Sequence, residues 1–427
     1  MRTLRLYNSR TRRKEIFTAR DGRVGMYVCG ITPYGVTHLG HAFTYTFFDV
    51  LGRYLRHIGY RTTYVQNVTD IDDDILKKAR EEKRNWREIG EANTQQFLED
   101  QRWLGNIQPD AYPRASDHIA EIAALVKKLL RKGAAYEKNG SVYFDARKDA
   151  PYGTLARMSH QKMLAVANER GNHPDDPNKK DPLDFVLWQA KKPGEPAWDS
   201  PWGAGDVQTS AGGVQTSAGG VRTSAGGVRT SAGRPGWHIE CSAMATKYLG
   251  ETIDIHGGGG DLIFPHHESE EAQSRAANGK PLARWWMHAG MLRYRGEKMS
   301  KSLGNLILIS DLKKRYTANA VRIYLLSHHY RSSFEFFERD MKKAVEREQT
   351  LQRVWRLQSA AGARLDPASW RNAFYKALAD DTDTPQALEI LEDMARTIAK
   401  TKTKTTTDAK AFLNTAFSIL GLQFAFQ

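Results

Sequence analysis

The segment 24–59 constrains the fold of this chain more than any other stretch. Residues 24–30 alternate as in a buried strand, with Met26 and Val28 on one face. Apolar side chains then recur at three- and four-residue spacing over 39–59, which predicts an amphipathic helix. A strand, a glycine-bearing turn and a helix form the first unit of a nucleotide-binding α/β fold, whose ligands bind at the carboxyl ends of the strands.

Two histidines stand where this predicted helix begins. His38 and His41 are three residues apart, so their side chains share one volume at the helix N-terminus. The helix dipole and the free N–H groups at that end favour a phosphate. By itself the pair is weak evidence, because a surface pair of histidines is at least as common as a phosphate site.

A second predicted strand, 64–68, ends in the acidic run 70–74. One interpretation is that these carboxylates bind a cation or the amine of a substrate. The other is that they oppose the dipole at the start of a helix, with Thr69 or Asp70 as its N-cap. The sequence leaves both interpretations open.

Cysteine, histidine and carboxylate side chains gather in the stretch 236–270. Such side chains bind soft to borderline divalent ions. His266 and Glu270 are four residues apart and would share one face of a helix. The chain has 2 cysteines, and Cys29 lies far upstream, so it joins the group only if the fold brings it beside Cys241. The candidate ligands within the stretch are Cys241, His256, His266, His267, Glu268 and Glu270.

Four copies of a seven-residue unit, the last two of them GVRTSAG, occupy residues 206–233. The unit is too short for a solenoid repeat with its own core. One valine per copy and the glycines at the junctions exclude a coiled coil. The small, polar, glycine-rich composition predicts a flexible surface loop without a catalytic role.

Length and charge bound the remaining possibilities. A chain of 427 residues predicts two or three domains. It has no apolar run of about 18 residues and no apolar signal core near its start, which predicts a cytoplasmic protein without a membrane span. The net charge of +14 is compatible with a polyanionic partner such as RNA and equally with a generally basic surface.

Later in the chain, 285–292 is predicted to be a strand, and a helical pattern runs from 311 to the end. Between them, Lys298 and Lys301 flank a serine in a glycine-bounded loop. Two such ammonium groups suit a mobile clamp that neutralises the charge on a departing polyphosphate.

Together these motifs resemble the class I aminoacyl-tRNA synthetases, whose signature pair corresponds to THLGH and KMSKS in this order. Four further strings are similar to the cysteinyl-tRNA synthetase family, which includes the mycothiol-pathway cysteine ligases. The resemblance covers residues 3 to about 422 apart from the repeats. The six motifs lie at 26–32, 37–41, 64–73, 234–244, 254–274 and 298–302.

The resemblance implies an α/β fold, with a Rossmann-type parallel-sheet catalytic domain, an inserted connective element and a C-terminal α-helical bundle. Family members normally continue into an anticodon-binding domain, and this sequence ends where that domain would begin. The mycothiol-pathway ligases end at a similar point. The expected boundaries are 1–120 and 234–315 for the catalytic domain, 121–205 for the insertion, 206–233 for the repeats and 316–427 for the bundle.

The resemblance also implies the roles of individual residues. One Zn²⁺ per chain would be held by Cys29, Cys241, His266 and Glu270, leaving His267 and Glu268 as neighbours of the ligands. The expected ATP contacts are Thr32, His38, Gly40, His41 and Lys301, and the expected catalytic residues are His38, His41, Lys298 and Lys301. The expected cysteine pocket is formed by Thr69, Trp237 and His256, and the glycines 257–260 would let the backbone approach the adenosine.

The implied reaction is the activation of L-cysteine by ATP, with Mg²⁺ on the phosphates, to a cysteinyl-adenylate. The cysteinyl group would then pass to the 3′ end of tRNA(Cys). The alternative acceptor is the amine of glucosaminyl-inositol, as in the mycothiol-pathway ligases. A monomer without membrane association is expected.

Overall fold

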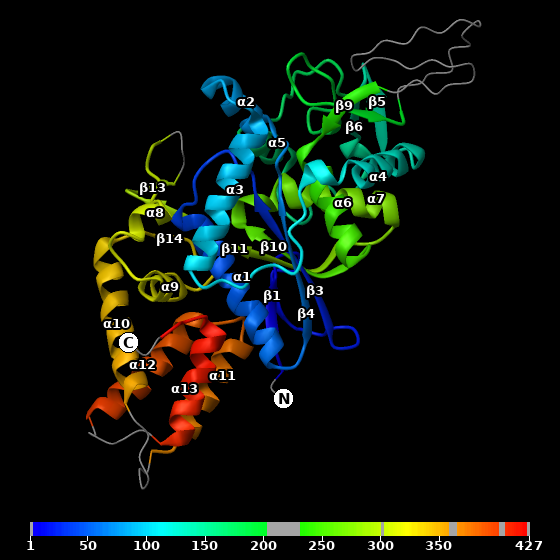
Figure 1. The fold of residues 1–427 in the computed structure, drawn as a ribbon. Helices are drawn as coiled ribbons and strands as arrows, with labels where there is room; N and C mark the ends of the chain where they lie inside the picture. The colour runs from blue at the N-terminus through cyan, green and yellow to red at the C-terminus, as the bar shows by residue number, and fades with distance from the viewer. Residues whose placement is uncertain (1–2, 203–230, 300–302, 358–364, 401–405, 425–427) are drawn as a thin grey trace, which may run out of the picture.

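A four-stranded parallel sheet forms the centre of the molecule in the computed structural model (Figure 1). Its order is β11-β10-β3-β4, so two strands from the first part of the chain lie beside two from the second. The strands are β3 (Arg23–Ile31), β4 (Arg61–Val68), β10 (Ile253–Gly259) and β11 (Ala283–Ala289). The structure describes residues 3–202, 231–299, 303–357, 365–400 and 406–424.

The alternation along β3 decides which helix each side chain meets. Met26 and Val28 pack in the same apolar cluster as helix α1 (Leu39–His57). Tyr27 and Cys29 point to the other face and pack with residues of α6 (Trp237–Leu249). Since both faces are covered, the strand is buried along nearly its whole length, as is usual in a parallel sheet.

The predicted strands 24–30 and 64–68 and the helix from residue 39 are confirmed. The remaining helices of the catalytic region also lie against the sheet or above its carboxyl edge (Figure 1). They are α2 (Asp73–Glu82), α3 (Trp86–Trp103) and α7 (His266–Asn278), the last of which connects β10 to β11.

A second sheet forms the insertion and has the order β5-β6-β7-β9-β8, with each pair of neighbouring strands antiparallel. Its last strand in sequence, β9, begins with the final three residues of the fourth repeat, so these residues are not the predicted loop. The rest of the repeats, up to residue 230, lies outside the described residues. The elements are β5 (Ala135–Lys138), β6 (Ser141–Phe144), β7 (Phe185–Ala190), β8 (Trp198–Ser200), β9 (Ser231–Pro235), α4 (Ile119–Arg131) and α5 (His160–Asn168).

The C-terminal part is helical but not throughout, which corrects the prediction from residue 311 onward. A short strand, β14 (Phe334–Glu335), pairs with β12 (Leu292–Tyr294), which in turn pairs with β13 (Glu297–Lys298). The strand predicted at 285–292 is therefore divided between two sheets. The helices are α8 (Ile309–Leu312), α9 (Ala318–Leu326), α10 (Glu338–Arg356), α11 (Ala368–Ala379), α12 (Thr384–Lys400) and α13 (Thr407–Leu420).

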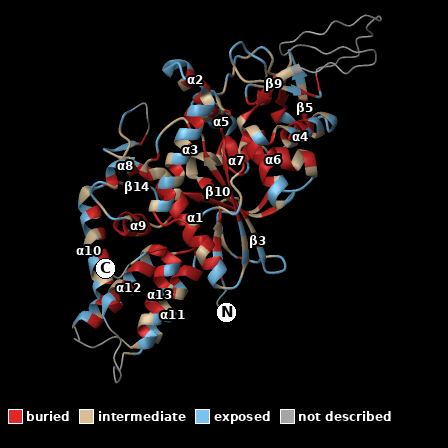
Figure 2. Ribbon diagram, viewed as in Figure 1, coloured by how far each residue is buried: buried red, intermediate tan, exposed pale blue. Residues whose placement is uncertain are grey.

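Buried residues continue from the parallel sheet into the helical part without interruption (Figure 2). At this junction the guanidinium of Arg322 in α9 is fully buried and forms an ion pair with Asp49 of α1. It also donates to the carbonyl oxygens of Leu104 and Leu420. Asp49 accepts a further hydrogen bond of 2.9 Å from Arg53. These bonds join α1, the segment after α3 and the end of α13.

A small antiparallel hairpin of β1 (Arg5–Asn8) and β2 (Arg13–Ile16) precedes the catalytic sheet. Its first strand contacts the outer strand β11. Among the helices in the described part of the chain, none combines the length and the apolar character that a membrane crossing needs.

Candidate functional site

Three separate elements contribute side chains to one buried cluster. Cys29 lies near the carboxyl end of β3, Cys241 lies on α6, and His266 and Glu270 lie one turn apart on α7. One ligand atom from each of the four lies within 4.8 Å of all the others. The fold therefore places Cys29 beside the ligands of the stretch 236–270.

The distances within this cluster fit a tetrahedral metal ion. The Sγ atoms of Cys29 and Cys241 are 3.9 Å apart. Two Zn–S bonds of about 2.3 Å at a tetrahedral angle would place their sulfurs about 3.8 Å apart. A disulfide would require about 2.0 Å, so the two buried thiols are free. A donor set of two thiolates, an imidazole and a carboxylate is typical of zinc.

Neighbouring rings orient His266. Its Nδ1 lies 2.9 Å from Nδ1 of His238, so one of these two nitrogens carries a proton and donates it to the other. Trp237 stacks on the His266 ring at 4.4 Å between centroids. The Nε2 atom of His266 faces Glu270 at 3.6 Å and is left for a metal ion.

Burial governs the protonation of these groups. It raises the pKa of Glu270 well above its ordinary value, with a smaller contribution from the charge of Glu271. Burial, followed by the neighbouring Cys241, raises the pKa of Cys29 in the same direction. It lowers the pKa of His266 well below 6.5. Burial thus favours the neutral forms of these groups when no cation is present, and a bound divalent ion would favour the thiolate and the carboxylate.

His256 does not stand apart from this cluster. Its Nε2 lies 3.2 Å from Oε1 of Glu270, and the imidazole is fully buried. Burial lowers the pKa of His256 to about 3, so the ring is neutral. His256 and His267 form a second group of four potential ligands with Cys29 and Glu270, again within 4.8 Å. The sequence named His256 and His267 as candidate ligands, whereas the resemblance assigned His256 to the cysteine pocket and His267 to the neighbours of the ligands.

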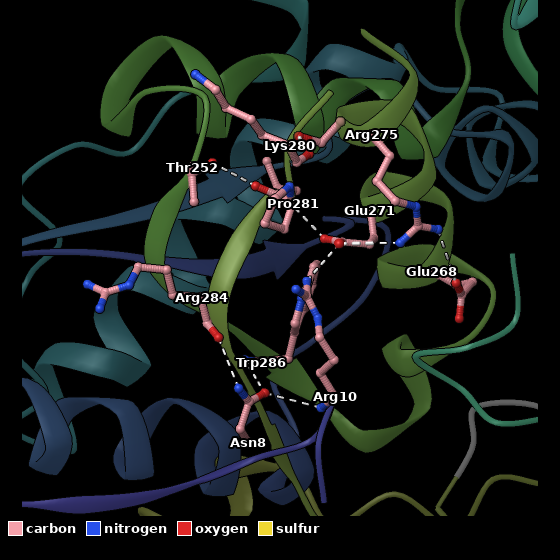
Figure 3. Close-up of polar contacts among 12 residues, drawn as sticks. Asn8, Arg10, Thr252, Glu268, Glu271, Arg275, Lys280, Pro281, Arg284 and Trp286 are labelled. Carbon is pink, nitrogen blue, oxygen red and sulfur yellow. Dashed lines mark hydrogen bonds and ion pairs between the residues drawn. The ribbon is translucent and has the colours of Figure 1, made fainter. Parts of the chain in front are cut away.

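The outer side of α7 is held by an ion-pair network that the sequence did not reveal (Figure 3). Glu271 lies 2.7 Å from Arg10 of the N-terminal hairpin and 3.3 Å from Arg275. Its other oxygen accepts a hydrogen bond of 3.0 Å from the backbone of Leu282. Because Glu271 follows Glu270 directly, these contacts fix the register of the helix that carries two of the ligands.

The two histidines of the THLGH motif lie together. His38 is the N-cap of α1, and its Nδ1 accepts from the backbone N–H groups of Gly40 at 3.2 Å and His41 at 3.4 Å. The His38 and His41 rings stack at 3.7 Å. A Cβ atom on Gly40 would approach the His38 ring to 3.0 Å, so glycine leaves room for this cap. In this arrangement two of the N–H groups at the start of α1 are hydrogen-bonded to the His38 side chain.

Thr69 and Thr32 follow the ends of β4 and β3. Thr69 is buried, its Oγ1 accepts from Asn67 at 3.2 Å, and its N–H donates to the carbonyl of Ile31 at 3.0 Å. Thr32 is half-buried. The backbone of Lys298 lies in β13, whereas Lys301 lies outside the described residues.

The acidic run is a helix start, but its cap differs from the prediction. Asp72, rather than Thr69 or Asp70, is the N-cap of α2 and accepts from the N–H of Asp74 at 2.8 Å. Asp70 instead accepts from the backbone and hydroxyl of Ser116. The prediction was wrong by two or three residues because the bend after β4 extends further before the helix begins.

The first two glycines of the run 257–260 allow close packing. A Cβ atom on Gly257 would lie 2.1 Å from the Phe48 ring of α1. On Gly258 it would lie 2.7 Å from Leu262. At these two positions the protein's own side chains fill the space that a Cβ atom would need, and the approach of the adenosine to the glycine run stays a prediction.

Comparisons with known proteins agree with these features. The chain matches the model of the tRNA synthetases class I (C) catalytic domain over residues 15–207 and 228–346, and the DALR domain over 373–425. The cysteine--tRNA ligase of Haemophilus influenzae strain PittGG is 42% identical over 424 residues, covering 98% of this chain and 85% of the relative. That of Thermococcus onnurineus strain NA1 is 41% identical over 417 residues, covering 94% and 81%.

A solved structure shares the fold. The methionyl-tRNA synthetase of Mycobacterium tuberculosis, in complex with methionyl-adenylate, has a TM-score of 0.60 and covers 93% of this chain and 88% of its own. The identity is 15%, so this likeness concerns the fold alone.

Proposed function

This chain belongs to the cysteine--tRNA ligase family of class I tRNA synthetases, and we propose that its buried metal centre is what selects cysteine. The chain is an ATP-dependent ligase that joins cysteine to tRNA. The observation that carries the proposal is the set formed by Cys29, Cys241, His266 and Glu270 around one buried space.

The donor chemistry explains how such a centre would separate cysteine from serine. When bound, Zn²⁺ supplies a Lewis-acid site for which the thiolate of the substrate is a good ligand and a serine hydroxyl is a poor one. A buried polar contact that only the correct substrate satisfies can discriminate strongly without editing. Stacked on His266, the Trp237 ring would form the wall beside the substrate side chain.

The nucleotide side of the site would lie at the start of α1. His38 and His41 present stacked imidazoles there and would contact the phosphates of ATP, with Mg²⁺ on the same phosphates. The cysteine carboxylate would attack the α-phosphate in line, forming the mixed anhydride and releasing pyrophosphate. Lys298 and Lys301 would neutralise the charge that develops on the departing pyrophosphate. Catalysis of this kind consists mainly of positioning and electrostatic stabilisation.

The acceptor that receives the cysteinyl group is tRNA. The relatives described above are both named for tRNA, and the alternative amino-sugar acceptor is not favoured. The basic net charge of +14 agrees with a polyanionic partner. The cytoplasmic location and the monomeric state stay predictions.

One experiment tests both the amino acid and the acceptor. The purified protein is incubated with ATP and labelled cysteine, and incorporation is measured into purified tRNA(Cys) and, separately, into glucosaminyl-inositol. Incorporation into the tRNA is expected. Incorporation into the sugar alone would refute the assignment, and a protein that contains no zinc yet forms cysteinyl-adenylate would refute the metal centre.

A further inference from the structure

We propose that the metal centre contains a second, overlapping ligand set, formed by Cys29, His256, His267 and Glu270, which holds the ion when Cys241 or His266 is lost. This inference rests on the zinc centre proposed above and extends it. Its consequence is a hierarchy among the ligands. Cys29 and Glu270 belong to both sets, whereas Cys241 and His266 belong to one.

The carboxylate of Glu270 stands between the two sets. Its Oε1 atom faces His256 at 3.2 Å, and its Oε2 atom faces both His266 at 3.6 Å and His267 at 3.9 Å. Each set has one ligand atom per residue within 4.8 Å of the other three. An ion can thus exchange one pair of ligands for the other while it keeps Cys29 and Glu270.

His267 is oriented as a ligand in the same way as His266. Its Nδ1 lies 2.7 Å from Nε2 of His288, whose own Nδ1 lies 2.8 Å from the hydroxyl of Ser9. The Nε2 atom of His267 is buried and has no hydrogen-bond partner within the described parts of the chain. An imidazole whose one nitrogen is engaged by a neighbour presents the other nitrogen to a metal ion.

Packing on both sides holds the His256 ring in place. The ring stacks on Trp286 at 4.5 Å with an interplanar angle of 19°, and Tyr27 meets it edge-on at 5.2 Å. It is fully buried on β10, a central strand of the parallel sheet. His256 therefore stays beside Glu270 whether or not Cys241 is present.

The choice between the sets follows from ligand softness. The first set offers two thiolates and the second offers one, so the first binds zinc more tightly. Each set contains four donors, all of types that zinc uses. Because Cys29 and Glu270 are shared, the two sets are alternatives for a single ion.

Two cysteine variants of the whole chain form a matched pair that tests the hierarchy. We expect Cys29→Ala to lose zinc and Cys241→Ala to keep close to one ion per chain, measured by atomic absorption after gel filtration. In the Co²⁺-loaded Cys241→Ala protein, the thiolate-to-metal absorption should fall to about half of the wild-type intensity, because one of two Co–S bonds remains. Circular dichroism checks that each variant is folded.

A double variant identifies the replacement ligand. His256→Ala alone should retain zinc with the full thiolate absorption, whereas Cys241→Ala combined with His256→Ala should lose the ion. If Cys241→Ala does not fold, His266→Ala serves in its place and should retain zinc. Equal zinc loss in the Cys29 and Cys241 variants would overturn the second set, as would two ions per wild-type chain. A wild-type protein without zinc would instead refute the proposed metal centre itself.

Discussion

The Sγ atoms of Cys29 and Cys241 lie 3.9 Å apart although 212 positions separate them in the sequence. Two features of the fold bring them together. The side chain of Cys29 points from β3 toward the face that α6 covers, and α6 packs against both β3 and β4. The distance fits two thiolates on one tetrahedral ion and is too long for a disulfide.

Replacing Cys241 by serine should reduce the preference for cysteine over serine by at least about tenfold, because the ion then rests on a different ligand set. Pyrophosphate exchange with each amino acid measures this preference. Ser242→Ala is a matched control on the next residue, buried but outside both ligand sets, and should keep the wild-type preference. An unchanged preference in a Cys241→Ser protein that has lost its zinc would contradict the role of the metal in selection.

The buried ion pair between Arg322 and Asp49 predicts a large loss of stability in Arg322→Met. The change leaves the carboxylate of Asp49 buried without this partner, which typically costs about 3–5 kcal/mol in the free energy of unfolding. Arg315 pairs with Glu338 at the surface, and Arg315→Met should cost less than about 1 kcal/mol. Urea unfolding compares the two variants, and similar losses in both would argue against a special role for Arg322.

Gly257→Ala should destabilise the protein by about 1–3 kcal/mol, because the new methyl group overlaps the Phe48 ring. Gly25→Ala on the neighbouring strand is the control, since its Cβ atom would meet Leu249 at an ordinary 3.4 Å. Adding Phe48→Leu to Gly257→Ala should recover part of the loss, as measured by thermal unfolding. If the double variant is no better than the sum of the single ones, packing against Phe48 is not the cause.

Removing the first three repeats, residues 206–226, should leave stability and aminoacylation close to those of the full chain. The last copy still supplies Ser231–Gly233 of β9, which pairs with both β7 and β8. Gly233→Val should be destabilising, because a Cβ atom there would lie 2.3 Å from both the Gln189 carbonyl oxygen and the Trp188 ring. A deletion of 206–226 that inactivates the enzyme would show that the repeats have a function of their own.

We expect His328 to contribute to the loss of folding stability at acidic pH. Burial lowers its pKa below 6.5, while the ring stacks on Phe334 at 3.7 Å. The unfolded chain therefore binds more protons at this group than the folded one, and the free energy of unfolding falls as pH decreases below about 6.5. His328→Asn should show a shallower fall in urea unfolding between about pH 7 and 5. If the free energy of unfolding falls equally steeply with pH in both proteins, His328 is not a source of the acid sensitivity.

Local patterns were enough to predict the parts of the fold that depend on neighbours in sequence. The alternation over 24–30 and the helical spacing from residue 39 predicted β3 and α1, since side-chain periodicity follows from backbone geometry. The spacing of His266 and Glu270 likewise placed them on one face of a helix, and both lie on α7. The predicted cap of α2 was two or three residues too early, because the end of a bend depends on contacts such as that between Asp70 and Ser116.

By itself, the sequence determined which types of metal-binding side chain this protein contains. Through its motifs, it also determined the family to which the protein belongs. Only the tertiary structure decided that His256 and His267 lie close enough to Cys29 and Glu270 to form a second set of potential ligands with them. It also decided that Gly257 makes room for Phe48 and that Arg322 is buried against Asp49. The physical reason is that helical and strand periodicity arise within a few residues, whereas these contacts join segments that meet only when the sheet and the helices pack together.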